Sequence, residues 1–264
     1  MRIRMSLSPI TKINHLIYED SVKAWEGINM IFLFGHKDLD IVRQGNAVYM
    51  YDTVVTINKS NIDPSFDLGR NFNYTFNKWQ TLVSNYISWD DLKQLKHELF
   101  SNDGKKSFSI PFQFSNNHKH GKSCLISLLV SKQVNSKLPK LDIFMRSSEI
   151  TKRLMVDLVL FHRMGEYLFD KQPFSVVIHF QQLFQDNHVL MMYHVHSNLR
   201  KLCRSMGYKF KEMPWYPIYR KFMTSDISDI RYKVHKRVVR VLRPDTMEGK
   251  EYPYTPVEDC RLKL

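Results

Sequence analysis

The sequence has few cysteines and no long apolar run, and both shortages restrict where the protein works. No stretch of the 264 residues approaches the roughly eighteen consecutive apolar residues of a membrane-spanning helix, and the start MRIRMSLSPIT lacks the apolar core of a signal peptide. The three cysteines, Cys124, Cys203 and Cys260, are scattered and odd in number, which favours free thiols in a reducing compartment. We therefore expect a cytoplasmic protein without a membrane partner.

Several common motifs are also absent. The chain contains no phosphate-binding GxxxxGK(S/T) loop, no dinucleotide-binding GxGxxG and no hydrolase GxSxG. H-x-H pairs occur at residues 118–120 and 194–196, but no cysteine or acidic cluster at zinc spacing accompanies them, so no metal site is predicted. Because the chain has no repeat and no Gly/Ser-rich linker, residues 1–264 are expected to form one domain.

Acidic residues are too few to balance the basic ones. The chain has 39 Lys and Arg against 26 Asp and Glu, and its formal charge is +13. Residues 200–264 are basic overall, and RYKVHKRVVRVLR (231–243) alternates basic and apolar side chains like a strand with one charged face. Contact with nucleic acid and a solvated sheet face both explain this pattern, and no nucleic-acid-binding motif decides between them.

The periodicity of the remaining chain indicates an α+β domain. Helices are predicted over 24–35, from the N-cap Ser88 to a stop at Asn102-Asp103-Gly104, and through LMVDLVLF (154–161). Strands are predicted over 107–114, 123–130 and 141–148, whereas residues 36–75 look irregular and rich in turns. These elements favour a mostly antiparallel or mixed sheet with several buried helices.

One carboxylate stands in an apolar segment. LMVDLVLF is apolar almost all round and should be buried as a helix, yet it contains Asp157. A buried carboxylate needs a partner or a shifted pKa, because the charge is costly away from water. Asp157 is therefore a candidate for contact with a ligand, and the alternative is a structural partner such as backbone, Arg or Lys.

Cys124 is expected on an apolar strand just after a polar loop, where a thiol would lie at the rim of a sheet. Most strand cysteines are small buried hydrophobic residues. Hairpin pairing would bring Arg146 close to this thiol, and a nearby guanidinium favours the nucleophilic thiolate. Arg146, Ser147 and Ser148 together also offer the charge and hydroxyl donors of a phosphate-binding segment.

Several short motifs follow one another in a fixed order across residues 88–200. They are the basic pair Lys105-Lys106, Cys124, the segment Arg146-Ser147-Ser148-Glu149, Asp157, and His194-Val195-His196-Ser197-Asn198. Their order and spacing resemble the thymidylate synthase/deoxycytidylate hydroxymethylase superfamily. This resemblance implies a thymidylate synthase-like α/β sandwich, with one large twisted mixed sheet, helices on one face and a homodimer interface on the other.

The resemblance also implies a chemistry. Members transfer a one-carbon unit from 5,10-methylenetetrahydrofolate to C5 of a pyrimidine deoxynucleoside monophosphate, and Cys124 matches the nucleophile that adds to C6. Arg146 and Ser147 match the phosphate-binding pair that activates the thiol. Lys105 and Lys106 match two arginines that reach across the dimer to the partner's nucleotide phosphate, with a looser grip because lysine lacks the bidentate fork.

Other positions carry over with larger departures. Glu149 matches an aspartate that supports folate binding, and His194 and His196 match the pair that binds the deoxyribose 3′-hydroxyl. The catalytic glutamate of the family falls near Gly27, which makes the adjacent Glu26 the candidate general acid and base. One residue of shift turns a helical side chain by about 100°.

Asp157 falls where members that act on uracil carry Asn and members that act on cytosine carry Asp. The resemblance therefore favours conversion of dCMP to 5-hydroxymethyl-dCMP, a virus-like trait that points to a phage origin. The alternatives are a non-catalytic homologue that binds nucleotide or nucleic acid, and an enzyme that acts on uracil.

Overall fold

A computed structural model provides the structure of the chain. It describes residues 13–34, 36–44, 47–72, 74–102, 107–114, 124–132, 138–151, 153–186, 207, 209–212, 257–260 and 262. The basic segment 231–243, for which nucleic-acid contact was predicted, lies outside these residues.

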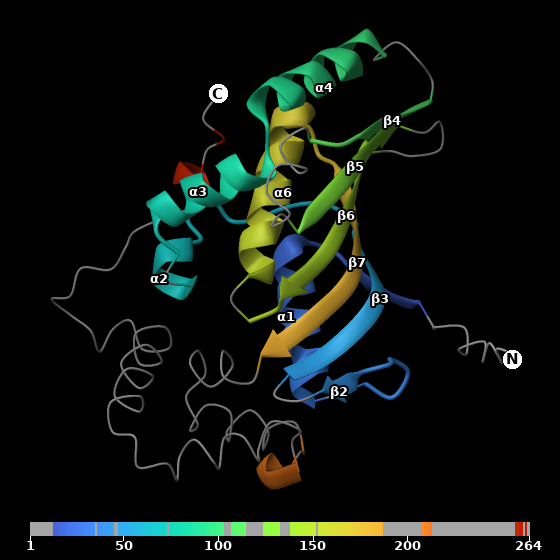
Figure 1. The fold of residues 1–264 in the computed structure, drawn as a ribbon, viewed down its shortest axis with the longest axis vertical. Coiled ribbons are helices and arrows are strands. Elements are labelled where there is room, and N and C mark those ends of the chain that lie inside the picture. The colour runs from blue at the N-terminus through green and yellow to red at the C-terminus, as the bar shows by residue number, and fades with distance from the viewer. Residues whose placement is uncertain are drawn as a thin grey trace, which may run out of the picture.

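A seven-stranded mixed sheet forms the centre of the molecule (Figure 1). Its strands are β1 (Asn14–Tyr18), β2 (Val42–Gln44), β3 (Ala47–Ile57), β4 (Phe108–Phe112), β5 (Leu125–Lys132), β6 (Lys140–Glu149) and β7 (Ser175–Asp186). The order is β1-β3-β7-β6-β5-β4, and β2 pairs with β3 beside this path. The β1–β3 and β6–β7 pairs are parallel and the other pairs are antiparallel, so the mixed sheet agrees with the prediction.

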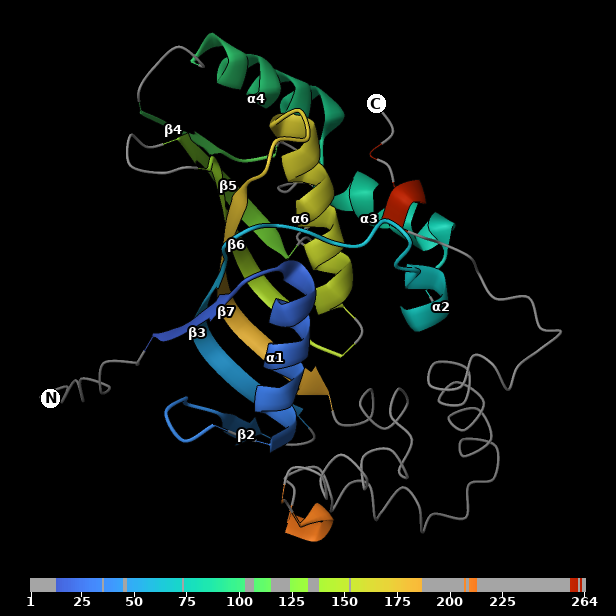
Figure 2. The same ribbon diagram turned by 180° about the vertical axis from the view of Figure 1, so that it is seen from behind.

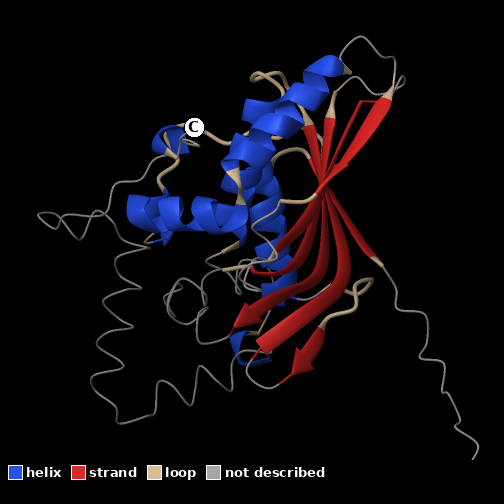
Figure 3. Cartoon of the chain, turned by 45° about the horizontal axis from the view of Figure 1, so that its top comes forward, coloured by secondary structure: helices blue, strands red, loops and turns tan. Residues whose placement is uncertain are grey.

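The described α-helices lie on one face of this sheet (Figures 2 and 3). They are α1 (Ser21–Phe34), α2 (Leu68–Phe72), α3 (Phe76–Tyr86), α4 (Trp89–Ser101) and α6 (Leu154–Leu168), and two 3-10 turns follow at Phe210–Glu212 and Val257–Asp259. A mixed α/β sandwich with helices on one face was predicted, and the structure has it. The homodimer expected on the other face stays a prediction.

Helix α6 is the buried helix of the layer. It contacts α1, α4 and β6, and twelve of its fifteen residues are buried, as expected for a helix that is apolar almost all round. By contrast, α3 buries one stripe of side chains, Trp79, Leu82, Val83 and Tyr86. Thr75 caps α3 by accepting the backbone N–H of Lys78 at 3.3 Å. Ser88 occupies the same position before α4, but its side chain makes no capping hydrogen bond, so the predicted cap is wrong in that respect.

The prediction that residues 36–75 are irregular is wrong. This segment contains β2, α2 and the eleven-residue β3, which lies between β1 and β7 inside the sheet. Buried side chains alternate along β3 on both sides of Asp52, but Asp52 adopts a positive φ of 46° and shifts the alternation by one residue. The break hides an otherwise regular strand pattern.

The same break occurs in three neighbouring strands at one level. Asp52 of β3, Gln181 of β7 and Arg146 of β6 are aligned across the sheet, and all three are missing from otherwise continuous pairing registers. In β7 the buried residues are Val176, Ile178 and Phe180 before the break and Leu183 and Gln185 after it. Because each strand carries its extra residue at the same level, the register between them does not change. Within β6, the side chains that follow Arg146 therefore point to the opposite face from the one that the alternation before the break would give them.

Candidate functional site

Cys124 lies directly before β5, next to the end of β6. Antiparallel pairing of these strands places Leu125 opposite Met145, and the backbone N–H of Arg146 donates to the carbonyl of Cys124 at 2.7 Å. The half-buried thiol lies 3.6 Å from the hydroxyl oxygen of Ser147, within hydrogen-bonding distance for sulfur. Strand pairing therefore brings a free thiol to the segment that follows the break in β6.

That segment passes from the surface into the interior within four residues. Arg146 is exposed, Ser147 is half-buried, and Ser148 and Glu149 are buried. The carbonyl of Glu149 then accepts the backbone N–H of Arg153, just before α6. Charge, hydroxyl and carboxylate groups thus follow one another from solvent toward the start of α6.

Asp157 is buried completely and has two partners. The hydroxyl of Ser148 donates to Oδ2 at 2.8 Å, and Nε of Arg153 lies 3.3 Å from Oδ1 without the alignment of a hydrogen bond. Burial raises the pKa of Asp157 to about 6, and the charge of Arg153 and the hydrogen bond from Ser148 oppose this increase. The carboxyl is therefore ionised at neutral pH. The alternative that Asp157 pairs with an arginine agrees with these contacts, and its role toward a base stays a prediction.

Arg153 is the residue that the sequence analysis missed. Its Nη1 donates to the hydroxyl of Tyr74 at 2.8 Å and its Nη2 to the hydroxyl of Tyr86 at 3.3 Å. The guanidinium also lies over both rings, 5.8 and 5.5 Å from their centroids. The spacing R-x-x-x-D in RLMVD was a usable signal, because residues four apart on a helix are neighbours. We call Arg153, Asp157, Ser148, Tyr74 and Tyr86 the Arg153 cluster.

Tyr86 connects this cluster to Cys124. Burial raises the pKa of Tyr86, the carboxylate of Asp157 and a thiolate at Cys124 act in the same direction, and Arg153 acts against them. Cys124 therefore lies within electrostatic reach of the cluster. The thiol, the Ser147 hydroxyl and the Arg153–Asp157 pair belong to one region of the molecule.

The structure does not bring Glu26 to this region. Its side chain is half exposed, and its carboxylate pairs with Lys23 at 3.2 Å on the outside of α1. Helix α1 instead buries Asn29, whose amide nitrogen donates to the carbonyl of Trp25 at 2.8 Å and reaches that of Ile150 at 3.5 Å. The one-residue offset noted in the sequence places Glu26 on the solvent side of the helix.

The other predicted binding residues lie outside the described part of the chain. They are Lys105, Lys106, His194 and His196. Cys260, in contrast, is described, and burial raises the pKa of its thiol to about 12. Of the two described cysteines, Cys124 is the more accessible.

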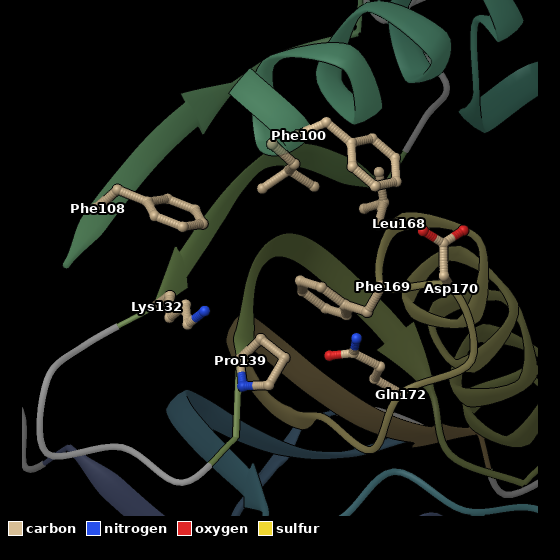
Figure 4. A pocket seen from close by; sticks show the side chains of 9 residues that line it. Phe100, Phe108, Lys132, Pro139, Leu168, Phe169, Asp170 and Gln172 are labelled. Atoms are coloured by element: carbon tan, nitrogen blue, oxygen red, sulfur yellow. The ribbon is translucent and has the colours of Figure 1, made fainter. Parts of the chain in front are cut away.

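A small cavity of about 100 Å³ lies at the opposite end of the β5 and β6 strands (Figure 4). Its walls are mainly apolar and come from the C-terminal ends of α4 and α6 and the adjacent strand ends; they include Phe100, Phe108 and Phe169. Lys132 and Asp170 add one charge of each sign. No member of the Arg153 cluster lines this cavity, and neither does Cys124.

The described residues form neither a metal site nor a membrane-spanning helix. No group of three or more His, Cys, Asp or Glu side chains could hold a metal ion among them. Within the same residues, no helix has the length and apolar character needed to cross a membrane.

Comparisons with known proteins give only distant similarity in fold. No protein-family model matches the chain, and neither does any curated protein sequence. Among solved structures, the chain is similar to the thymidylate synthase of T4 phage, with 12% sequence identity and a TM-score of 0.33. The similar region covers 63% of this chain and 77% of the phage protein. This is a distant similarity in fold, and it assigns no chemistry to the residues described above.

Proposed function

We propose that the protein transfers a one-carbon unit from 5,10-methylenetetrahydrofolate to C5 of dCMP and releases 5-hydroxymethyl-dCMP. The observation that carries this proposal is the position of the free Cys124 thiol, 3.6 Å from the Ser147 hydroxyl and joined through backbone to Arg146. A thiol that lies next to a hydroxyl and a cationic residue has the neighbours expected of a covalent nucleophile.

Cys124 adds its thiolate to C6 of the pyrimidine, so that C5 gains the electron density needed to attack a one-carbon donor. The proton on C5 is then lost, water supplies the hydroxyl group, and the thiolate leaves C6. Atoms balance overall, because dCMP, methylenetetrahydrofolate and water give 5-hydroxymethyl-dCMP and tetrahydrofolate.

We assign the nucleotide phosphate and sugar to basic, hydroxyl and imidazole side chains. Arg146, Ser147 and Ser148 offer the charge and hydroxyls for the phosphate, although Ser148 also holds Asp157. We assign Lys105 and Lys106 to the phosphate of the partner subunit's nucleotide, and His194 and His196 to the 3′-hydroxyl. Asp157 belongs to the part of the site that recognises the base, at the position where members of the resembling superfamily that act on cytosine carry Asp.

The folate supplies the one-carbon unit when it is bound, and buried polar atoms near the end of β6 fit its polar ring. Glu149 is buried there, and Oδ1 of Asn29 and Oγ1 of Thr151 are buried without hydrogen-bond partners. Such atoms are stabilised by a ligand that brings its own donors, since unsatisfied buried acceptors are costly. Glu149 and Asn29 would hold the folate, with Asn29 taking part of the polar role expected of Glu26.

The test is incubation of the protein with methylenetetrahydrofolate and either dCMP or dUMP, with products read by mass spectrometry. We expect dCMP to gain one hydroxymethyl group and tetrahydrofolate to accumulate in equal amount. The Cys124→Ser variant should give no product, while Cys260→Ser, at the buried thiol, should retain turnover. If only dUMP is converted, the substrate is dUMP and not dCMP. If Cys124→Ser still gives product, Cys124 is not the nucleophile.

A second candidate is a non-catalytic homologue that binds the nucleotide. The exposed position of Glu26 favours it, because the general acid and base expected from the family is absent from the site. Nucleotide binding without any product, in the presence of the folate, is the outcome that distinguishes this candidate from the enzyme.

A further inference from the structure

Arg153 is placed where a ligand from solvent would meet it before Asp157. The Asp157 carboxyl is fully buried, whereas the Arg153 side chain is 29% exposed. Ser148 and Arg153 cover the carboxyl from two sides, at 2.8 and 3.3 Å. A base that enters this region therefore contacts the guanidinium and not the carboxylate.

The described contacts of Arg153 leave part of its donor set unused. A guanidinium carries five N–H donors in a rigid fork. Nε is paired with Asp157 as an ion pair, Nη1 donates to Tyr74 and Nη2 to Tyr86, which leaves one N–H on each of Nη1 and Nη2. The contacts with both tyrosines and the carboxylate hold the plane of the guanidinium, and the two remaining donors lie in that plane.

Those donors suit one pyrimidine better than the other. Cytosine presents two adjacent acceptors, N3 and O2, which a guanidinium can bind with two parallel hydrogen bonds. Uracil carries a hydrogen on N3 between its two carbonyl groups, so one donor of the fork would face another donor. An arginine at this position therefore accepts cytosine in its neutral form and opposes uracil.

We propose that Arg153 is the specificity-determining residue for cytosine, that it binds N3 and O2 of the base, and that Asp157 is a positioning residue that orients it. This inference rests on the proposed function, since it assumes a pyrimidine nucleotide beside Cys124. It differs from recognition of cytosine by Asp157 in one respect that can be measured: the protein does not recognise the 4-amino group of cytosine.

The test uses three nucleotides and measures their dissociation constants by calorimetry without folate. They are dCMP, dUMP and the deoxynucleotide of pyrimidin-2-one, which keeps N3 and O2 but lacks the 4-amino group. We expect the wild type to bind dCMP about 10- to 100-fold more tightly than dUMP, because a mismatched buried donor is costly. The pyrimidin-2-one nucleotide should bind within a few-fold of dCMP.

Variants at Arg153 should remove this preference. Arg153→Met should bind dCMP and dUMP about equally, and Arg153→Lys, which keeps the charge next to Asp157, should recover part of the preference for dCMP. Asp157→Asn should still prefer dCMP, more weakly. The control Lys93→Met, at an exposed lysine of α4, should bind like the wild type. Circular dichroism identifies any variant that fails to fold. If Arg153→Met fails to fold, Arg153→Lys still tests the proposal.

Three outcomes would overturn this assignment. They are a preference for dCMP that survives in Arg153→Met and Arg153→Lys, a pyrimidin-2-one nucleotide that binds as weakly as dUMP, and an Asp157→Asn variant that prefers dUMP. Each leaves the proposed function intact. Failure of the wild type to bind any of the nucleotides would overturn the proposed function and this assignment together, whereas intact binding without turnover would overturn only the enzymatic proposal.

Discussion

The carboxyl of Asp157 lies in the protein interior, where burial disfavours its ionised form. The carboxyl is fully buried, and burial is the largest influence on its pKa, which rises to about 6 despite Arg153 and Ser148. A folded-state pKa above the unfolded value means that the folded protein binds the proton more tightly than the unfolded chain does. The ionised carboxylate therefore lowers stability relative to the protonated form.

The pH dependence of stability follows from that sign. Stability contributed by Asp157 is present below the unfolded pKa and falls as pH rises toward the folded value near 6. Between about pH 4.5 and about pH 7.5, the difference in unfolding free energy should shift by about 2 kcal/mol in favour of Asp157→Asn over the wild type. The charge of Arg153 is constant over this range and adds only a fixed offset. Urea unfolding at several pH values measures the shift.

The control for this experiment is Asp40→Asn, at an exposed carboxylate. Its difference from the wild type should not change between the same pH values. If the difference in unfolding free energy between Asp157→Asn and the wild type is also independent of pH, the buried carboxyl does not titrate as described. Its ionised state then does not lower stability.

The sequence identified Asp157 as buried because one acid interrupted an apolar helix, and it identified Cys124 and Arg146 as neighbours because strand pairing follows from local periodicity. It did not identify Tyr74 and Tyr86 as partners of Arg153. Those tyrosines lie 79 and 67 residues away in the chain, just before α3 and at its last residue, and only the tertiary fold brings them to Arg153. Long-range polar contacts of this kind leave no periodic signal.

At the scale of elements, α6 packs closely because of one glycine. A Cβ placed on Gly165 would overlap the ring of Phe174, which is 2% exposed. That ring cannot move aside easily, because His162 and Phe169 flank it at centroid distances of 6.1 and 5.4 Å. The close approach lets the segment after α6 return directly into β7.

Gly165→Ala should therefore destabilise the protein by about 1–3 kcal/mol, because overpacking forces side chains from their preferred rotamers. Gly27→Ala in α1 is the matched comparison. Its Cβ would meet the ring of Tyr18, which is only half-buried and can shift, and alanine gains about 1 kcal/mol of helix propensity. Thermal unfolding of both variants should place Gly165→Ala well below Gly27→Ala; equal melting temperatures would contradict the packing described.

Elements with an unbroken pattern were predictable, and β3 was not. Helices α4 and α6 and strands β4, β5 and β6 appear within a few residues of their expected positions. In β3, the positive φ of Asp52 changes the face that each following side chain occupies, so a strict alternation fails across the whole strand. Its burial depends on pairing with β7, which no local pattern reports.

At the scale of the molecule, the sheet has one face without described helices (Figure 3). Side chains on this face include the stacked rings of Phe144 and His179, 4.5 Å apart, and Ile17, which is 61% exposed. Lys140 and Asp142 form an ion pair of 2.9 Å on the same sheet. A face that mixes apolar rings with paired charges suits contact with a second copy of the chain better than permanent exposure.

We expect the protein to be a homodimer in solution, with twice the chain mass of 31.5 kDa by light scattering or sedimentation. Ile17→Glu should weaken the dimer, since both copies would bring a negative charge to the interface. Phe100→Glu changes an equally exposed apolar residue on α4, away from this face, and should leave the mass unchanged. A monomer at micromolar concentration, or a stronger effect of the α4 variant, would exclude this interface.

The pairing of β3 with β7 also has a consequence during synthesis. The nearest paired residues, Ile57 and Val176, are 176 − 57 = 119 residues apart. A ribosome that adds about 5–20 residues per second needs roughly 6–24 s to make that interval. For that time the apolar strand β3 has no partner on the side that β7 later occupies, and it can pair with other nascent chains instead. Yield in the cell should therefore respond to chaperone supply and to the rate of translation between residues 57 and 176, even where the stability of the finished protein is unchanged.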